Sequence, residues 1–405
     1  MVASFLSLNV LRIAGLALSY LVIVFLSRSQ GPETLGQYMF LVNSAIVIGT
    51  LASLGLPTLV QRLSARLTAD TIGVGTCQAL RRRWLAMVAI SAGGAIAILE
   101  LDGDATFSVS SVMALALASF AFALSQILTE TVRIAYGPQA AEFQRNLLRP
   151  ALMIALLSIG IGVSLVVPMA MVGTVMLVIW RLRATLRKSV QDVTAISSYV
   201  AERSRDLGTV FLLGFVGLLF GSMDVVLIGL ITDAGTTGIY GAASRYGMLI
   251  NVVLLAGNAQ MVLHLARLAS GFDEDGQSLL ALRRLILMIR IASTLLLAAT
   301  AAMLPLYARI INLPAAELWP YFTVVALSFW LQSIIGPVNM FMLQAHAAKW
   351  LIFFHVVGAG AFAVVGAVFY LQGTMLAVPL AVGVGANLVK ILAWFWIAKN
   401  YGIRL

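Results

Sequence analysis

The chain has 405 residues, of which 61% are hydrophobic and 10% are charged, and its formal net charge is +10. Because soluble domains carry about 25% charged residues, this composition excludes a soluble globular protein and indicates an integral membrane protein. The only cysteine, Cys77, excludes an internal disulfide and a redox or metal cluster built on thiolates.

The apolar segments predict an all-α polytopic membrane protein. Runs of about 18 or more apolar residues recur along the chain, which favours spanning helices over barrel strands. The first run lacks a small-residue cleavage site and is followed directly by another, so we expect a retained helix there. Windows between turn-forming residues predict about twelve spans, at 8–27, 35–57, 83–101, 109–130, 150–167, 169–186, 208–231, 238–262, 285–304, 318–343, 350–371 and 375–398. The fifth and sixth of these are divided at Pro168.

Lysine and arginine predict the orientation of these spans. One set of alternate loops holds almost all the cations, whereas the opposite set holds only Arg28 and Arg309, beside several acids. Cationic loops stay in the cytoplasm, so both termini are expected to be cytoplasmic, with an even number of spans. This topology and anionic membrane lipids explain the net positive charge, and no nucleic-acid partner is expected.

The two halves of the sequence resemble each other at an offset of about 202 residues. The matches are TLGQY (34–38) on TTGIY (236–240), Gly55 on Gly257, Arg81–Arg82 on Arg283–Arg284 and, after a small insertion, QAAEF (139–143) on HAAKW (346–350). Six spans per half insert with the same orientation, so a duplication predicts two pseudo-symmetric lobes with a substrate path between them. The expected domains are a lobe at 1–186, a cytoplasmic linker at 187–207 and a lobe at 208–405.

Polar residues recur at helical spacing inside the predicted spans. Four stripes lie on the first, second, fourth and eighth spans: Asn9, Arg12 and Ser19; Asn43, Thr50 and Pro57; Ser119, Gln126 and Arg133; Ser244, Asn251 and Asn258. Residues at these separations share one face of a helix, so the stripes are consistent with the walls of one central cavity. The alternative is that these side chains join neighbouring helices by hydrogen bonds.

Two arginines inside predicted spans indicate an anionic ligand. Arg12 lies near the start of the first span, and Arg245 lies in the eighth, where the repeat aligns it with Asn43. Guanidinium groups stay charged when partly desolvated and bind phosphate through two N–H donors. Snorkelling of Arg12 to the interface and a structural ion pair of Arg245 are the alternatives.

Asp224 is the one acid expected at the centre of a span. A charge there costs roughly 2.5–3.5 kcal/mol on insertion scales, so its presence requires a function or a partner. It is expected to bind Na⁺ or to take up a proton, with Asn387 as a candidate neutral ligand. The alternative is an ion pair with Arg12, Arg245 or Lys390.

The histidines predict no metal site. His264, His346 and His355 are far apart and show no ligand spacing, so we expect them in loops or at the membrane interface. No cofactor is expected beyond a coupling ion.

Two segments resemble a known family. MDVVLIGLITDAGTTGIYGAASR (223–245) and SRSQGPETLGQYMFLVNSAIVIGTLASLGLPTLVQR (27–62) resemble signatures of polysaccharide-biosynthesis flippases in the multidrug/oligosaccharidyl-lipid/polysaccharide exporter superfamily. The resemblance implies two six-helix lobes in a V around a cationic cavity, in the bacterial inner membrane. It implies transport of an undecaprenyl-diphosphate-linked glycan, with polysaccharide polymerase and chain-length proteins as candidate partners. Arg12 and Arg245 match cavity arginines of that family, and Asp224 matches an acid that helps to hold a coupling cation in some relatives.

The sequence therefore predicts a non-enzymatic flippase that works by alternating access. Arg12, Asn43, Gln126, Arg245 and Asn251 are its candidate substrate-binding residues. A small-molecule or drug antiporter of the same fold is the first alternative, although cationic drugs would favour carboxylates over arginines. A polysaccharide polymerase or glycosyltransferase would need acids or histidines on a long outer loop, and no outer loop exceeds about fifteen residues. An inactive assembly partner of sugar enzymes is a further alternative.

Overall fold

The computed structural model describes residues 2–63, 72–101, 109–187, 200–202, 208, 211, 221–269, 277–345 and 347–402. The chain forms two compact units, each of which is described by itself below. Unit 1 comprises Met1–Leu218 and Ile228–Gly238, and unit 2 comprises Leu219–Leu227 and Ile239–Leu405. The predicted linker at 187–207 is described only in part, so the expected domain boundaries stay predictions.

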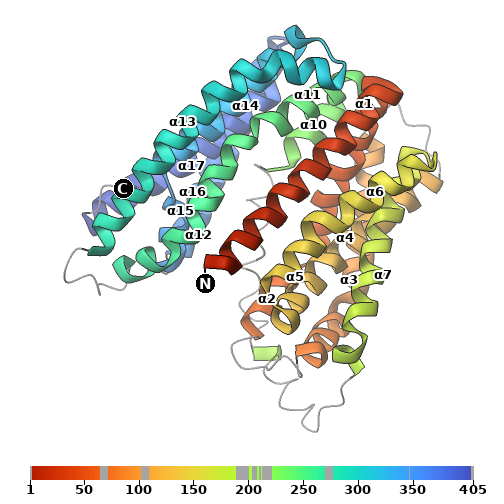
Figure 1. Cartoon of the computed structure of the whole chain (residues 1–405), viewed down its shortest axis with the longest axis horizontal. Helices are drawn as coiled ribbons and strands as arrows, with labels where there is room; N and C mark the ends of the chain where they lie inside the picture. Colours follow the sequence, from red (N-terminus) through yellow and green to blue (C-terminus); the bar gives the residue numbers. More distant parts are fainter. Residues whose placement is uncertain are drawn as a thin grey trace. The chain divides into compact units, whose positions relative to one another are not determined.

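Both units are built of helices (Figure 1). The helices up to residue 187 are α1 (Val2–Ala52), α2 (Leu56–Leu63), α3 (Ile72–Leu101), α4 (Val109–Tyr136), α5 (Pro138–Glu142), the π-helix η1 (Phe143–Leu148), α6 (Arg149–Ser158) and α7 (Val163–Arg187). The later helices are α10 (Met223–Ile231), α11 (Ala234–Gly247), α12 (Leu249–Ala269), α13 (Gln277–Ile311), α14 (Ala315–Ile335), α15 (Val338–Gln344), α16 (Ala348–Leu371) and α17 (Ala377–Tyr401).

The helices confirm an all-α polytopic membrane fold. Among the described residues, nine helices are long and apolar enough to cross a bilayer. One of them, Val10–Ala52, covers most of the first two predicted spans. A kink at Gly31, which has φ 86° and ψ 176° and is followed by Pro32, separates the two spans within it. The seventh predicted span lies largely outside the described residues.

The predicted division between the fifth and sixth spans is wrong. Residues 138–158 form one uninterrupted helical segment, and α7 then begins at Val163. The break falls at Gly160, whose φ of 82° a glycine adopts without steric cost. Pro168 lies inside α7, where it forfeits one backbone hydrogen bond, a loss that membrane helices tolerate.

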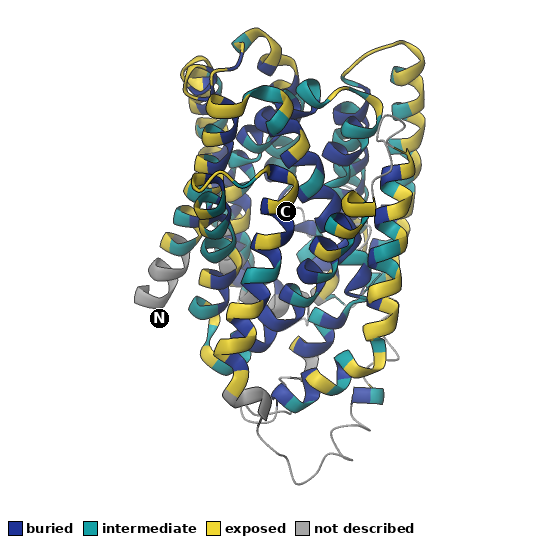
Figure 2. Cartoon of the chain, turned by 90° about the vertical axis from the view of Figure 1, so that its right-hand side faces the viewer, coloured by how far each residue is buried: buried dark blue, intermediate teal, exposed yellow. Residues whose placement is uncertain are grey.

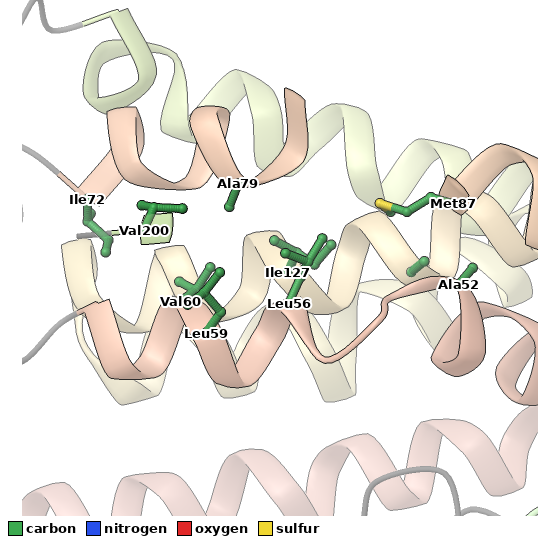
Figure 3. Close-up of a cluster of buried hydrophobic side chains, with 10 residues drawn as sticks. Ala52, Leu56, Leu59, Val60, Ile72, Ala79, Met87, Ile127 and Val200 are labelled. Atoms are coloured by element: carbon green, nitrogen blue, oxygen red, sulfur yellow. The ribbon is translucent and has the colours of Figure 1, made fainter. Parts of the chain in front are cut away.

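Helix α2 closes one end of the core of unit 1. Leu54 and Gly55, with φ of 52° and 73°, form the turn that separates α2 from α1. One face of α2 then buries Leu56, Leu59 and Val60 in a cluster completed by residues of α1, α3, α4 and the short segment at Val200: Ala52, Ile72, Ala79, Met87, Ala123, Ile127 and Val200 (Figure 3). The packing ties a piece of the predicted linker to this lobe.

Many helices bury one face and expose the other (Figure 2). The exposed side chains include large apolar residues such as Leu85, Leu101, Trp180 and Leu371, with exposed fractions of 64%, 68%, 63% and 85%. Such surfaces are stable only against lipid, whose chains are as apolar as leucine. The exposed pattern is therefore that of a protein surrounded by hydrocarbon.

The start of α11 crosses α1 at a contact between two repeat-related glycines of unit 1. A Cβ on Gly36 would overlap the carbonyl oxygen of Ala234, and a Cβ on Gly238 would overlap that of Pro32. Gly36 and Gly238 occupy equivalent positions of the TLGQY and TTGIY motifs. Small residues let membrane helices approach until their backbones touch, which explains why both motifs carry glycine there.

We expect Gly36→Ala to destabilise the protein by about 1–3 kcal/mol, because the added methyl group cannot fit without moving the backbone of α11. The measurement is thermal unfolding of the purified protein in detergent. Gly93→Ala is the matched control, since a Cβ at Gly93 meets nothing within 4 Å. Equal melting temperatures for Gly36→Ala and the wild type would contradict the backbone contact.

Candidate functional site

A tight hairpin between α10 and α11 positions the buried acid of unit 2. The helices end at Ile231 and begin at Ala234, and Asp233 starts α11 by accepting hydrogen bonds from the backbone N–H and the hydroxyl of Thr236, at 2.9 and 2.7 Å. These hydrogen bonds lower the pKa of the exposed Asp233 carboxyl. The cap therefore stabilises the hairpin at pH values above the pKa of this carboxyl in the unfolded chain, and it weakens as the pH falls through the pKa in the folded chain.

The hairpin brings Asp224 and Tyr240 together. Asp224 lies seven residues before the end of α10 and Tyr240 six residues after the start of α11, so antiparallel helices place them at similar depth. The Tyr240 hydroxyl donates a short hydrogen bond to Asp224 Oδ2. Tyr240 is fully buried and Asp224 is 9% exposed. Within the described part of the chain, Asp224 Oδ1 is buried and has no hydrogen-bond partner.

A small cavity with both polar and apolar walls lies beside this carboxylate. Its volume is about 30 Å³, and its walls come from α10, α11, α14 and α17 of unit 2. The polar side chains that line it are Asp224, Tyr240, Ser244, Ser328 and Gln332. A cavity of about 10–15 Å³ already holds one water, so this one has room for a small ion or for ordered water.

Asn387 supports the wall of the cavity. Its amide nitrogen donates to Ser328 Oγ at 2.9 Å and to the Gly383 carbonyl oxygen at 2.7 Å, and both of these residues line the cavity. Its Oδ1 is buried and has no hydrogen-bond partner among the described residues. The structure places Asn387 behind Ser328, and its role as a direct cation ligand stays a prediction.

The chemistry of the cavity suits a monovalent cation or a proton. The oxygens of Asp224, Tyr240 and Ser328 are hard donors of the kind that alkali and alkaline-earth cations prefer. One carboxylate balances one positive charge, whereas a divalent ion would be left with uncompensated charge in a membrane interior. Two of the three expected counter-ions are engaged elsewhere, since Arg12 pairs with Glu142 and the Lys390 ammonium donates to the Gly336 carbonyl oxygen at 3.4 Å.

Unit 1 holds a second charged cluster, around Glu142. Arg12 Nη2 donates to Glu142 Oε1 at 2.9 Å, and the Asn146 amide donates to Glu142 Oε2 at 2.6 Å. The Arg12 side chain is 44% exposed, whereas that of Glu142 is 8% exposed. The sequence left Arg12 with two interpretations, cavity lining or snorkelling, and neither included this partner.

A third buried acid, Glu130, lies in α4. The Gln61 amide donates to Glu130 Oε2 at 2.8 Å, and Arg133 Nη1 lies 3.4 Å from the same oxygen. Among the described residues, two acids besides Asp224 are therefore buried in the protein. From the sequence alone, Glu130 falls at the end of a predicted span and Glu142 in a predicted loop, whereas α4 continues to Tyr136 and α5 includes Glu142.

The other candidate substrate residues are divided between the units. Asn43 is fully buried and donates to the Met39 carbonyl oxygen at 2.7 Å, and Gln126 is half-buried in α4. Arg245 is half-buried in the last turn of α11, and Asn251 is half-buried in α12. The joint lining of one cavity by these residues and Arg12 stays a prediction.

His355 does not lie in a loop. It is buried in α16, and its Nδ1 lies 2.7 Å from the Leu351 carbonyl oxygen. This contact within one helix gives Nδ1 a partner. His346 lies outside the described residues.

The sequence matches no protein-family model and no curated protein. The fold is nevertheless similar to solved structures over nearly its whole length. An inward-facing multidrug resistance MATE family transporter of the MOP superfamily has TM-score 0.66 and 13% identity, covering 97% of this chain and 98% of that one. An outward-facing one has TM-score 0.62 and 15% identity, covering 98% and 95%. A MATE protein in complex with MaL6 has TM-score 0.62 and 16% identity, covering 98% and 96%.

We expect Tyr240→Phe to lower the free energy of unfolding by about 1–3 kcal/mol, because it leaves a second oxygen of the buried Asp224 without a donor. The measurement is thermal unfolding in detergent. Tyr370→Phe, which removes a hydroxyl from a side chain that is 62% exposed, is the control. A melting temperature of Tyr240→Phe equal to that of the wild type would contradict the importance of the Tyr240 contact.

Proposed function

We propose that this chain is a membrane transporter that works by alternating access and is coupled to a monovalent cation or a proton at Asp224. Its cargo in this proposal is a polyprenyl-diphosphate-linked oligosaccharide, moved across the bacterial inner membrane. The observation that carries the coupling is the buried Asp224 carboxylate, whose Oδ1 lacks a hydrogen-bond partner among the described residues and which lines a small cavity.

The fold supports the transporter class. The similar MATE structures include inward-facing and outward-facing conformations, and each covers at least 97% of this chain. An intramembrane carboxylate in such a fold is a functional residue by default, because its burial is costly and its replacement by an apolar residue would be simpler. Transport is therefore favoured over a structural or enzymatic role.

The pairing of two other buried acids supports an anionic cargo, because a carboxylate that is already compensated does not offer free charge to a cationic one. Glu130 and Glu142 each lie within 4 Å of an arginine, which leaves Asp224 as the described interior acid with an open oxygen. The diphosphate would be bound by Arg12 and Arg245, and the sugars by Asn43, Gln126 and Asn251. The lipid tail would stay in the bilayer while the headgroup crosses.

The second candidate is a small-molecule or drug antiporter. It is supported by the MATE transporters of the same fold, two of which are described as multidrug resistance transporters. It is also supported by Asp224, because a buried carboxylate with an open oxygen can bind the cationic group of a drug. The two candidates differ in the sign of the cargo, which makes them separable by experiment.

The cargo is tested in vesicles that contain the purified protein and a fluorescent undecaprenyl-diphosphate-linked oligosaccharide. We expect the wild type to move the probe between leaflets, and Arg245→Ala to reduce the rate about tenfold or more while the protein stays folded. Efflux of ethidium by the same vesicles, with no movement of the glycolipid, would replace the flippase with the drug antiporter.

The coupling site is tested by ligand-dependent stability. We expect Na⁺, or acidification, to raise the melting temperature of the wild type, because binding to the folded state stabilises it by about 2.7 kcal/mol at a hundredfold excess over Kd. Asp224→Asn should abolish this response. Glu317→Gln neutralises an exposed acid of unit 2 and should leave the response intact. A full response in Asp224→Asn would remove Asp224 from the coupling site.

A further inference from the structure

The Arg12–Glu142 pair is built by a close helix contact in unit 1. The α1 segment lies along α5, η1 and α6 (Figure 1). At Gly15 a Cβ would come within 2.6 Å of Asn146 Cβ, so glycine allows the two backbones to approach. Arg12 lies one turn before Gly15, and Glu142 lies one turn before Asn146, so the same approach sets the ion pair.

The local helix geometry presents Glu142 in a fixed position. Glu142 is the last residue of the short α5, which follows Gly137 with φ 90°, and it precedes the π-helix η1. Single π-helical turns occur mainly at functional sites, because they re-aim side chains at a cost in hydrogen bonding. Both oxygens of the carboxylate are held, one by Arg12 and the other by Asn146.

The surroundings of this carboxylate carry an excess of positive charge. Arg145, in η1, is exposed, and Arg149 lies one turn later with its guanidinium 4.9 Å from the centre of the Phe122 ring. The Arg149 Nε is buried without a hydrogen-bond partner among the described residues. Arg12 and Arg145 therefore both act on Glu142, and Arg12 is the one that the carboxylate holds by a direct hydrogen bond.

We infer that Glu142 is a resident counter-anion, which holds Arg12 when no cargo is bound and is displaced from it by the anionic headgroup. This inference rests on the proposed anionic cargo and adds a mechanism of release. Phosphate oxygens and the Glu142 carboxylate compete for the same guanidinium donors, which bind either anion with similar geometry. The returning carboxylate lowers the affinity for the headgroup, so the protein binds its cargo without retaining it.

The experiment measures binding of inorganic pyrophosphate to the purified full-length protein by titration calorimetry. Glu142→Gln keeps the size of the side chain and removes the competing charge, so we expect it to bind pyrophosphate about tenfold more tightly than the wild type. Arg12→Gln should bind more weakly, and the double variant Arg12→Gln/Glu142→Gln should show no gain over Arg12→Gln. Glu100→Gln, which neutralises an exposed acid in α3, is the control for net charge.

The outcomes separate this inference from the proposed function. Equal affinities for the wild type and Glu142→Gln, with weaker binding by Arg12→Gln, would overturn the inference and leave the anionic cargo standing. No pyrophosphate binding by any variant would overturn both. A gain that persists in the double variant, or that Glu100→Gln reproduces, would also overturn it. Should Glu142→Gln fail to fold, Asn146→Ala, which frees one oxygen of the carboxylate, should show a smaller gain.

Discussion

A carboxylate inside a membrane bundle must be compensated, because hydrocarbon offers no water to solvate it. The structure meets this requirement in two different ways. Glu130 and Glu142 are paired with arginine and amide side chains, whereas Asp224 receives a tyrosine hydroxyl on one oxygen and faces a small cavity. Glu130 and Glu142 therefore join helices of unit 1, whereas Asp224 keeps one oxygen open towards the cavity.

Short-range backbone features decide where these acids lie. The hairpin capped by Asp233 sets Tyr240 opposite Asp224, and the glycine at position 15 lets α1 approach η1. The contact between Gly36 and the start of α11 uses the same device. Small residues in membrane helices replace the hydrophobic effect as the source of association, since close backbones gain packing that lipid cannot match. The charged sites are therefore consequences of helix packing.

Under the proposed function, the two charged regions would serve different tasks in one transport cycle. The cavity beside Asp224 would hold a monovalent cation or a proton, because it has space for an ion of water size and a single negative charge. In the cluster around Glu142, the Arg12 side chain is 44% exposed and is held by the carboxylate. A transporter needs binding that is reversible, and a built-in competitor supplies that property without weakening the fold.

The membrane class and the approximate position of most spans could be predicted from the sequence, because hydrophobicity over about twenty residues is a local property of the chain. The break at Gly31 and the isolation of Asp224 in an apolar segment were equally visible. The break at Gly160 was not, because a proline in a membrane helix does not by itself end it.

The partners of the charged residues were decided only by tertiary structure. Arg12 and Glu142 are 130 residues apart, and no local pattern links them. Glu130 was assigned to the end of a span and Glu142 to a loop, because helix limits are read from hydrophobicity, which falls wherever a polar residue occurs, whether it is buried or exposed. The sequence by itself determined that charges enter the membrane region. The packing of α1 on η1 and of α10 on α11 decided which of them are neutralised and which oxygen of Asp224 stays open.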